Sequence, residues 1–124
     1  MSDSVQLSDA EWQIMNLIWE RQPIMAQDVI AAVCEPSGWT PSTVRTMLHR
    51  LAKKGSLLYT PEGNRYWYRA GVRRVDCVRQ AARSFLDRVF DGNAAPLLNH
   101  FVRSTKFTPE ELVELRQLLD RKEQ

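Results

Sequence analysis

The segment from Thr40 to Gly55 constrains the fold more than any other part of this chain. Thr40 is a suitable helix cap, and Pro41 suits the first helical position, where a missing amide hydrogen costs nothing. Apolar residues then recur three and four positions apart: Val44, Met47, Leu48 and Leu51. This spacing predicts a helix that buries one side and ends at Gly55.

The opposite side of the same helix is polar, cationic and free of carboxylates. It holds Ser42, Thr43, Arg45, Thr46, His49, Arg50 and Lys53. Ordinary surface helices carry charges of both signs, so this composition favours a polyanion such as nucleic acid as the partner.

Charge along the whole chain follows the same pattern, although the net charge is only +2. Residues 1–39 hold one base against six acids, and residues 40–74 hold eight bases against one acid. Residues 75–124 are balanced, with eight bases and eight acids. The basic block indicates a localised face for a polyanion, and a plain solvated surface is the alternative on charge alone.

The segments around this helix predict a winged helix-turn-helix over residues 1–71. A capping box at Ser8-x-x-Glu11 opens a first helix, which Pro23 closes and whose tryptophan-containing stripe we interpret as core. A second helix fits residues 26–34, with Met25 as a poor cap. Aromatic-rich runs at 56–60 and 65–69, joined by a turn at 61–64, predict a β-hairpin that serves as the wing.

Residues 72–124 predict a helical dimerisation domain, so the expected fold is mainly α with a small β-hairpin wing. A long helix with a coiled-coil-like apolar seam ends at Gly92, a short apolar segment follows, and a capping box of Thr108 and Glu111 opens the last helix. Three small helices make a thin core, so we expect a two-fold dimer. The residues expected at its interface are Val75, Val78, Ala82, Phe85, Leu86, Val89, Leu97, Leu98, Phe101, Leu112, Leu115, Leu118 and Leu119.

A winged helix reads DNA with side chains near the N-terminal end of its third helix, which lies in the major groove. The expected base-reading residues are Ser42, Thr43, Arg45 and Thr46, and Arg45 suits a bidentate contact to guanine. The expected contacts to the DNA backbone are Thr40, His49, Arg50, Lys53, Asn64 and Arg65.

Other classes of function find less support in the residues. Cys34 and Cys77 have no paired spacing and only His49 and His100 to join them, so we expect no metal and no cofactor. No nucleophile–base pair or phosphate loop indicates an enzyme. The chain shows no signal peptide and no membrane span, so we expect a cytoplasmic protein without a lipid partner.

A winged-helix module that binds protein or RNA stays open as the alternative. A gel shift over a salt series distinguishes such a module from a DNA-binding protein.

Several short motifs, spread over nearly the whole chain, occur together in one known family. They are Ala10-Glu11-Trp12, Met15-Asn16 with Ile18-Trp19, Trp39-Thr40-Pro41, Thr43-Val44-Arg45-Thr46, Arg50-Leu51 with Lys53-Lys54-Gly55, Phe101-Val102, and Glu110-Glu111-Leu112 with Leu115-Arg116. With these motifs the chain resembles the BlaI/MecI family of penicillinase repressors.

The resemblance implies a homodimeric transcriptional repressor that binds an inverted-repeat operator of the TACA/TGTA type, with base-reading positions at Thr43, Arg45 and Thr46. It implies control of β-lactam resistance genes and release by proteolysis, with a membrane sensor metalloprotease as partner. The family is cut at an Asn-Phe pair between the second and third C-terminal helices, and the matching position here is His100-Phe101, a departure from that pattern.

Two further features bear on the subfamily and on the target. Ser42 replaces a residue that is commonly basic in the family, which implies a different operator preference. The copper-responsive branch uses cysteine pairs in the C-terminal part, and this chain has none there, which argues against copper sensing.

Overall fold

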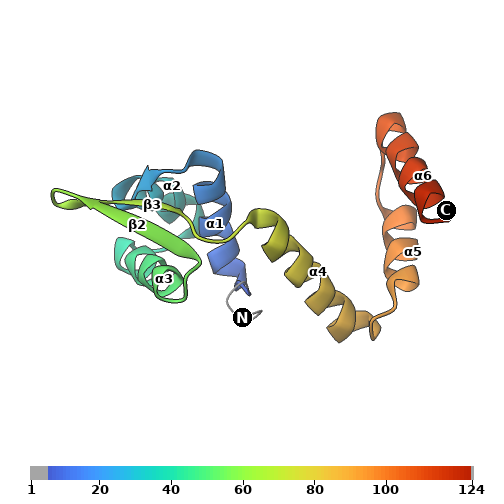
Figure 1. Ribbon diagram of the computed structural model, residues 1–124, viewed down its shortest axis with the longest axis horizontal. Helices are drawn as coiled ribbons and strands as arrows, with labels where there is room; N and C mark the ends of the chain where they lie inside the picture. Colours follow the sequence, from blue (N-terminus) through green and yellow to red (C-terminus); the bar gives the residue numbers. More distant parts are fainter. Residues whose placement is uncertain (1–5, 124) are drawn as a thin grey trace. The chain divides into compact units, whose positions relative to one another are not determined.

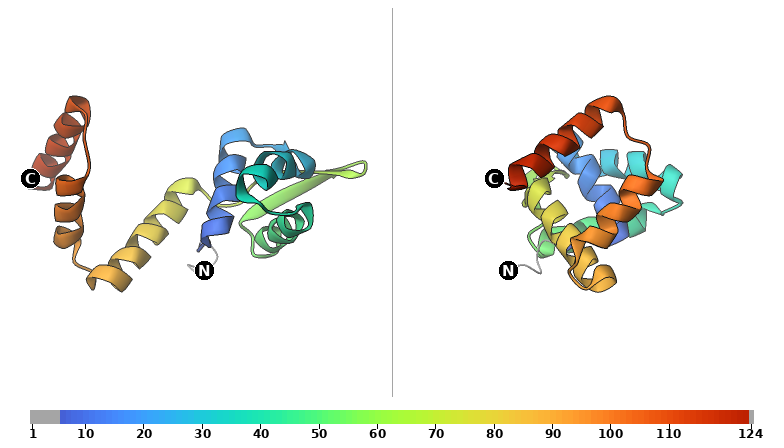
Figure 2. Two further views of the ribbon diagram at one scale, coloured as in Figure 1. Left: turned by 180° about the vertical axis from the view of Figure 1, so that it is seen from behind. Right: turned by 90° about the vertical axis from the view of Figure 1, so that its right-hand side faces the viewer.

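The computed structural model describes residues 6–123 and shows six helices and a small three-stranded sheet in that range (Figure 1). The chain divides into two compact units, one ending at Ser84 and one beginning at Phe85. The first unit holds α1, α2, α3 and all three strands, and the tip of its hairpin projects beyond the helices (Figure 2). This order confirms the winged-helix prediction.

Helix α1 (Asp9–Arg21) begins where the sequence predicts it. The Ser8 hydroxyl accepts a hydrogen bond from the Glu11 amide at 3.2 Å, and the Glu11 carboxylate accepts one from the Ser8 amide at 2.9 Å. Both bonds of the predicted capping box are therefore present, and they satisfy amides that a helix start otherwise leaves unpaired.

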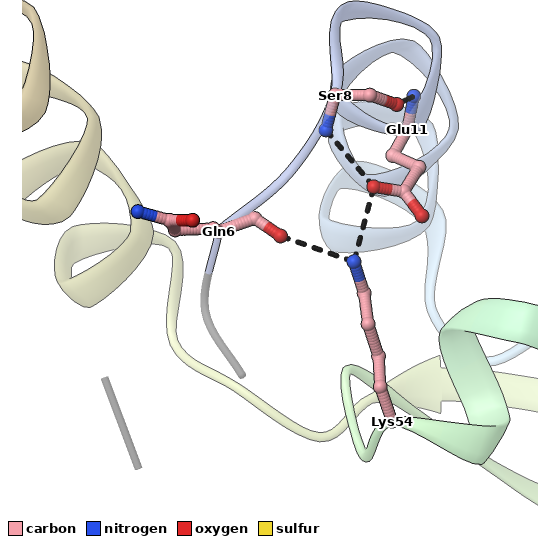
Figure 3. Close-up of polar contacts among 4 residues, drawn as sticks. All are labelled: Gln6, Ser8, Glu11 and Lys54. Atoms are coloured by element: carbon pink, nitrogen blue, oxygen red, sulfur yellow. Dashed lines mark hydrogen bonds and ion pairs between the residues drawn. The ribbon is translucent and has the colours of Figure 1, made fainter. Parts of the chain in front are cut away.

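Lys54, which follows the third helix in sequence, ties its loop to the start of α1 (Figure 3). Its ammonium donates to the Glu11 carboxylate at 3.1 Å and to the Gln6 carbonyl oxygen at 3.0 Å. Burial alone raises the pKa of Glu11, but hydrogen bonds from Ser8 and Lys54 and the charge of Lys54 outweigh it and lower that pKa below 4.5. Glu11 therefore stays ionised as the acceptor of this tie.

Helix α2 (Ala26–Ser37) starts without a side-chain cap at Met25, as expected, but runs three residues beyond the predicted end at Cys34. Pro36 lies inside its last turn, where the fixed φ of proline is compatible with helix and only one amide bond is lost. Gly38 then ends the helix at φ 74°, and its amide donates to the Cys34 carbonyl oxygen at 2.9 Å. The glycine, rather than the proline, sets the boundary.

Helix α3 (Pro41–Lys53) agrees with its prediction at both ends. The Thr40 hydroxyl accepts from the Thr43 amide at 3.2 Å, and Gly55 follows the helix in the left-handed conformation at φ 87°. Val44 and Leu51 are completely buried and Leu48 is 1% exposed, so the predicted apolar stripe is the side that packs inward.

The wing consists of β2 (Leu57–Glu62) and β3 (Arg65–Ala70), which pair antiparallel. The predicted four-residue turn is shorter in the structure, because Pro61 and Glu62 belong to the ladder and only Gly63 and Asn64 form the turn. Proline is tolerated there because β2 is an edge strand. Gly63 takes φ 64°, which favours glycine at this place.

A third strand, β1 (Ile24–Met25), pairs antiparallel with β3 and was not predicted. Its register places Ile24 opposite Tyr68 and Met25 opposite Trp67. Two residues are too short to show the alternation that identifies a strand in a sequence. This strand exists because the wing lies beside it.

The core of the first unit is made by side chains of α1, α2, α3, β1 and β2. It comprises Ile14, Met15, Ile18, Ile24, Val29, Val33, Val44, Leu48, Leu51 and Leu57. Trp19 packs against this core and donates its indole N–H to the Val72 carbonyl oxygen at 3.0 Å, while Trp39 also packs there. The interpretation of the helix-1 tryptophan stripe as structural is supported by this placement.

Helix α4 (Arg74–Phe90) begins in the first unit, where Cys77 is 1% exposed, and extends into the second. Helices α5 (Ala94–Ser104) and α6 (Pro109–Glu123) follow, and the predicted Thr108–Glu111 capping box is present, with bonds of 2.8 and 3.1 Å. Neither α5 nor α6 has a buried residue. Within residues 6–123, no helix combines the length and apolar character needed to cross a bilayer.

Candidate nucleic-acid interface

The polar side of α3 faces solvent. All seven of its hydroxyl-bearing and basic residues are exposed: Ser42, Thr43, Arg45, Thr46, His49, Arg50 and Lys53. Because the apolar stripe is fixed in the core, this side is presented on a rigid support rather than on a mobile loop. The predicted base-reading and backbone residues of α3 therefore share one exposed surface.

Two threonine hydroxyls on this surface already make local hydrogen bonds. The Thr43 and Thr40 hydroxyl oxygens are 3.0 Å apart, and the Thr46 hydroxyl donates to the Ser42 carbonyl oxygen at 3.0 Å. The hydroxyl proton of Thr46 is therefore used by the helix backbone. Its methyl group and oxygen lone pairs are the parts left for a ligand.

The structure divides the basic block of residues 40–74 into two groups. Lys54 pairs with Glu11, Arg73 donates to Asp76 at 3.1 and 3.2 Å, and Arg74 donates to Asn16 at 3.2 Å. The bond to Asp76 also raises the pKa of Arg73, and that of Asp76 is correspondingly lowered. The remaining bases are exposed and lie on α3 and the wing: Arg45, Arg50, Lys53, Arg65 and Arg69.

The wing tip meets the α3 surface at a hollow of about 190 Å³. Arg45 of α3 lines it together with Asn64, Arg65 and Tyr66 of the wing. The structure thus brings one predicted base-reading residue beside two predicted backbone residues that lie about twenty positions away in the sequence. Two guanidinium groups at one hollow make it attractive to an anion.

A second hollow, of about 540 Å³, lies between the C-terminal half of α3 and the wing. Its lining residues are His49, Ala52, Lys53, Tyr59, Tyr66 and Tyr68. The three tyrosines were not among the predicted site residues. The alternation of β3, which puts Tyr66 and Tyr68 on the face opposite Arg65, Trp67 and Arg69, was the signal that could have identified two of them.

The residues predicted for dimerisation remain uncovered within a single chain. Large exposed fractions are found at Val75 (50%), Phe85 (41%), Val89 (54%), Leu98 (52%) and Leu119 (60%). The other members are also exposed or half-buried: Val78, Ala82, Leu86, Leu97, Phe101, Leu112, Leu115 and Leu118. Exposed apolar patches are typical of surfaces that bind a partner, and the dimerisation role of these residues stays a prediction.

The predicted cleavage position does not lie between two helices as expected, and its role in cleavage stays a prediction. His100 and Phe101 lie inside α5, which continues to Ser104. No glycine or proline interrupts this segment after Pro96, so the helix runs on until Thr105 adopts an extended conformation. Both residues are exposed, with Phe101 at 48%.

Comparisons with known sequences agree with this architecture. The family model described as penicillinase repressor matches residues 7–121. The penicillinase repressor of Bacillus licheniformis is 35% identical over 115 residues, covering 93% of this chain and 90% of that protein. The methicillin resistance regulatory protein MecI of Staphylococcus aureus (strain N315) is 30% identical over 117 residues, covering 94% and 95%.

Two solved structures match a little more than half of the chain. The solution structure of the DNA-binding domain of the repressor BlaI is 38% identical, with a TM-score of 0.53, over 56% of this chain and 85% of that one. The monomeric form of Bacillus licheniformis BlaI in complex with the blaP half-operator is 39% identical, with a TM-score of 0.52, over 57% and 87%. Sequence and fold together show that the chain belongs to the penicillinase repressor family, a family of DNA-binding transcriptional repressors.

Proposed function

We propose that this chain represses transcription by binding an inverted-repeat operator as a homodimer, with α3 in the major groove of each half-site. The observation that carries the proposal is the two-sided nature of α3, which buries Val44, Leu48 and Leu51 and exposes a basic, hydroxyl-rich face without a carboxylate. Such a face is attracted to the phosphate charge of DNA and carries groups that can hydrogen-bond to base edges.

Base reading is assigned to Ser42, Thr43, Arg45 and Thr46 at the N-terminal half of α3. Arg45 offers a planar fork that matches the two acceptors of guanine in the major groove. Thr46 is suited to contact a thymine methyl group, because its hydroxyl proton is bound to the Ser42 carbonyl oxygen. These roles fit the relative BlaI, which was solved with a half-operator.

Contacts to the phosphodiester backbone are assigned to the residues around this reading surface. They are Thr40, His49, Arg50, Lys53, Asn64 and Arg65. Phosphate contacts fix the register of the protein on the duplex and carry no sequence information of their own. Arg45, Asn64 and Arg65 line one hollow. Their proximity supports a model in which the wing binds the DNA backbone beside the major groove that α3 enters.

The dimer is assigned to the helical part that follows the wing, with Gly71 as the boundary of the DNA-binding domain. Helices α5 and α6 have no buried residue, and exposed apolar side chains continue along α4. A second copy of the same helices covers this surface by a two-fold axis. Two reading helices then meet half-sites about 34 Å apart, or a multiple of that distance, on an inverted repeat.

Release from the operator is assigned to proteolysis near His100-Phe101, by a membrane sensor metalloprotease, in response to β-lactams. The exposure of Phe101 and the absence of buried residues in α5 support access to this segment. Its helical conformation requires local opening before a protease can bind it in an extended form. A cytoplasmic location is part of the proposal, because an operator-binding repressor acts where the DNA is.

The test combines a gel shift with footprinting. A duplex carrying inverted TACA/TGTA repeats should be retained over a scrambled duplex of equal length, and the affinity should fall linearly with salt on logarithmic axes. Footprinting should show two protected half-sites related by two-fold symmetry. Equal binding of both duplexes at every salt concentration contradicts the repressor function and favours a module that binds protein or RNA.

A further inference from the structure

The tyrosine groove, defined as the 540 Å³ hollow between α3 and the wing, is not accounted for by the roles assigned so far. Tyr59 and Tyr66 are 54% and 49% exposed, and their rings meet edge to face with centroids 5.3 Å apart. Tyr68 lies 6.2 Å from Tyr59 by the same measure. The three rings form one wall of the groove, and His49, Ala52 and Lys53 of α3 form the other.

The chemistry of the groove is that of an anion site with hydrogen-bond donors. Among the described residues that line it, Lys53 and His49 are the only ionisable side chains besides the phenols, and none is a carboxylate. Among residues 6–123, none of the three phenol hydroxyls has a hydrogen-bond partner. Burial, with a smaller effect of the neighbouring tyrosines, raises the pKa of Tyr68, so its hydroxyl keeps its proton at neutral pH.

The groove is continuous with the surface to which DNA binding is assigned. Tyr66 lines both the tyrosine groove and the hollow that holds Arg45, Asn64 and Arg65. A path therefore runs from the reading end of α3 along the wing to Lys53. When α3 enters a major groove and a wing reaches the next minor groove, the phosphodiester strand between the two grooves passes between helix and wing.

We propose that the tyrosine groove seats one phosphodiester strand of the operator, with the hydroxyls of Tyr59, Tyr66 and Tyr68 donating to phosphate oxygens beside Lys53. The assignment rests on the proposed function and adds three residues to the DNA-binding surface. Tyrosine side chains are among the usual donors to phosphate. Since phosphates are the same at every base pair, these contacts strengthen binding to all sequences alike.

Fluorescence anisotropy of the full chain with an operator duplex and a scrambled duplex, over a salt series, tests the proposal. Tyr59→Phe and Tyr66→Phe should each lower the affinity about three- to tenfold for both duplexes, because each removes one hydrogen bond. The salt slope should stay unchanged, since no charge is lost. Lys53→Gln should reduce that slope by about one unit for each phosphate contact removed.

Thr60→Val is the matched control, because Thr60 is an exposed hydroxyl residue of β2 on the face opposite Tyr59. It should leave both affinities unchanged. A double variant, Tyr59→Phe with Tyr66→Phe, that binds both duplexes within twofold of wild type overturns the groove proposal, and so does an equal loss in Thr60→Val. Neither result contradicts the proposed repressor function. That proposal is contradicted only if the wild-type chain does not prefer the operator duplex to the scrambled one.

Discussion

The two units of this protein use similar apolar periodicities with opposite results. In the first unit, α1 buries Ile14, Met15 and Ile18 completely. In the second unit, α6 has a comparable apolar stripe, yet Leu112, Leu118 and Leu119 are 43%, 48% and 60% exposed. An apolar stripe guarantees burial only where the chain supplies a partner for it. The first unit contains its own partners, whereas the apolar side chains of α6 stay exposed within a single chain.

Charge distinguishes the segment that forms α3 and the wing from the helices that follow it. The segment with eight bases and one acid supplies α3 and the wing, whereas residues 75–124 balance eight bases with eight acids. Identical copies that carry a strong charge of one sign repel each other, and a balanced surface avoids this cost. The basic region is therefore suited to DNA, and the balanced region is suited to a second copy of itself.

A charge placed in the second unit should change dimer stability more than the other substitutions change stability or binding. Phe85→Asp should weaken the dimer by about 3–5 kcal/mol, since it buries an unpaired carboxylate where an aromatic ring packed. Sedimentation equilibrium should then show monomers, and operator affinity should fall with the loss of the dimer. Arg83→Asp places the same group at an exposed position off the seam and should stay dimeric. If the Phe85→Asp protein remains dimeric, the dimer interface does not include Phe85.

Truncating a core side chain in the first unit should lower stability independently of dimerisation. Leu51 is completely buried, so Leu51→Ala should lower the free energy of unfolding by about 2–5 kcal/mol. The loss should be the same at low and high protein concentration in urea titrations. Leu119→Ala, at a residue 60% exposed in one chain, should show a loss that depends on concentration. If the two variants behave alike, the contrast between the units is wrong.

The next effect concerns function rather than stability. Arg45→Ala should reduce operator binding by about 1–3 kcal/mol and relax the choice of base at one position of each half-site. Circular dichroism and sedimentation should be unchanged, because Arg45 is exposed and lies outside both the core and the dimer seam. Unchanged discrimination between operator and scrambled DNA would remove Arg45 from the reading role.

The smallest effect is a pH dependence within the first unit. The pKa of Glu11 is lowered in the fold, so its stabilising contribution is present above about pH 4.5 and is lost as the pH falls through the folded-state pKa. Glu11→Gln keeps the capping geometry but loses the charge opposite Lys54, and should cost about 0.5–1 kcal/mol at pH 7.

Thermal melts at pH 7 and pH 3 check this, because the difference between Glu11→Gln and wild type should shrink at the lower pH. Glu20→Gln, at an exposed glutamate of the same helix, should show no such change. A difference for Glu11→Gln that is equal at both pH values would mean that the Lys54 contact contributes nothing through charge.

Local signals predicted most of the fold because they act within a few residues. The caps at Ser8, Thr40 and Thr108 each bond to an amide three positions on, and all three helix starts agree with the structure. The predicted end of α2 at Cys34 is three residues short, because Pro36 fits inside the last turn and Gly38 ends the helix. The strand β1 was missed because its pairing with Tyr68 and Trp67 is a contact across more than forty residues.

Residues a few positions apart are enough to predict which segments are helices, which of their faces are apolar and where the positive charge is concentrated. Tertiary structure alone decided which bases face outward. Lys54 belongs to the basic block, yet its ammonium donates to Glu11, 43 positions away, and so it is not one of the exposed bases of α3 and the wing. It likewise decided that three tyrosines share a groove with Lys53. Such contacts join residues far apart in the chain, and only the packed core fixes their distance.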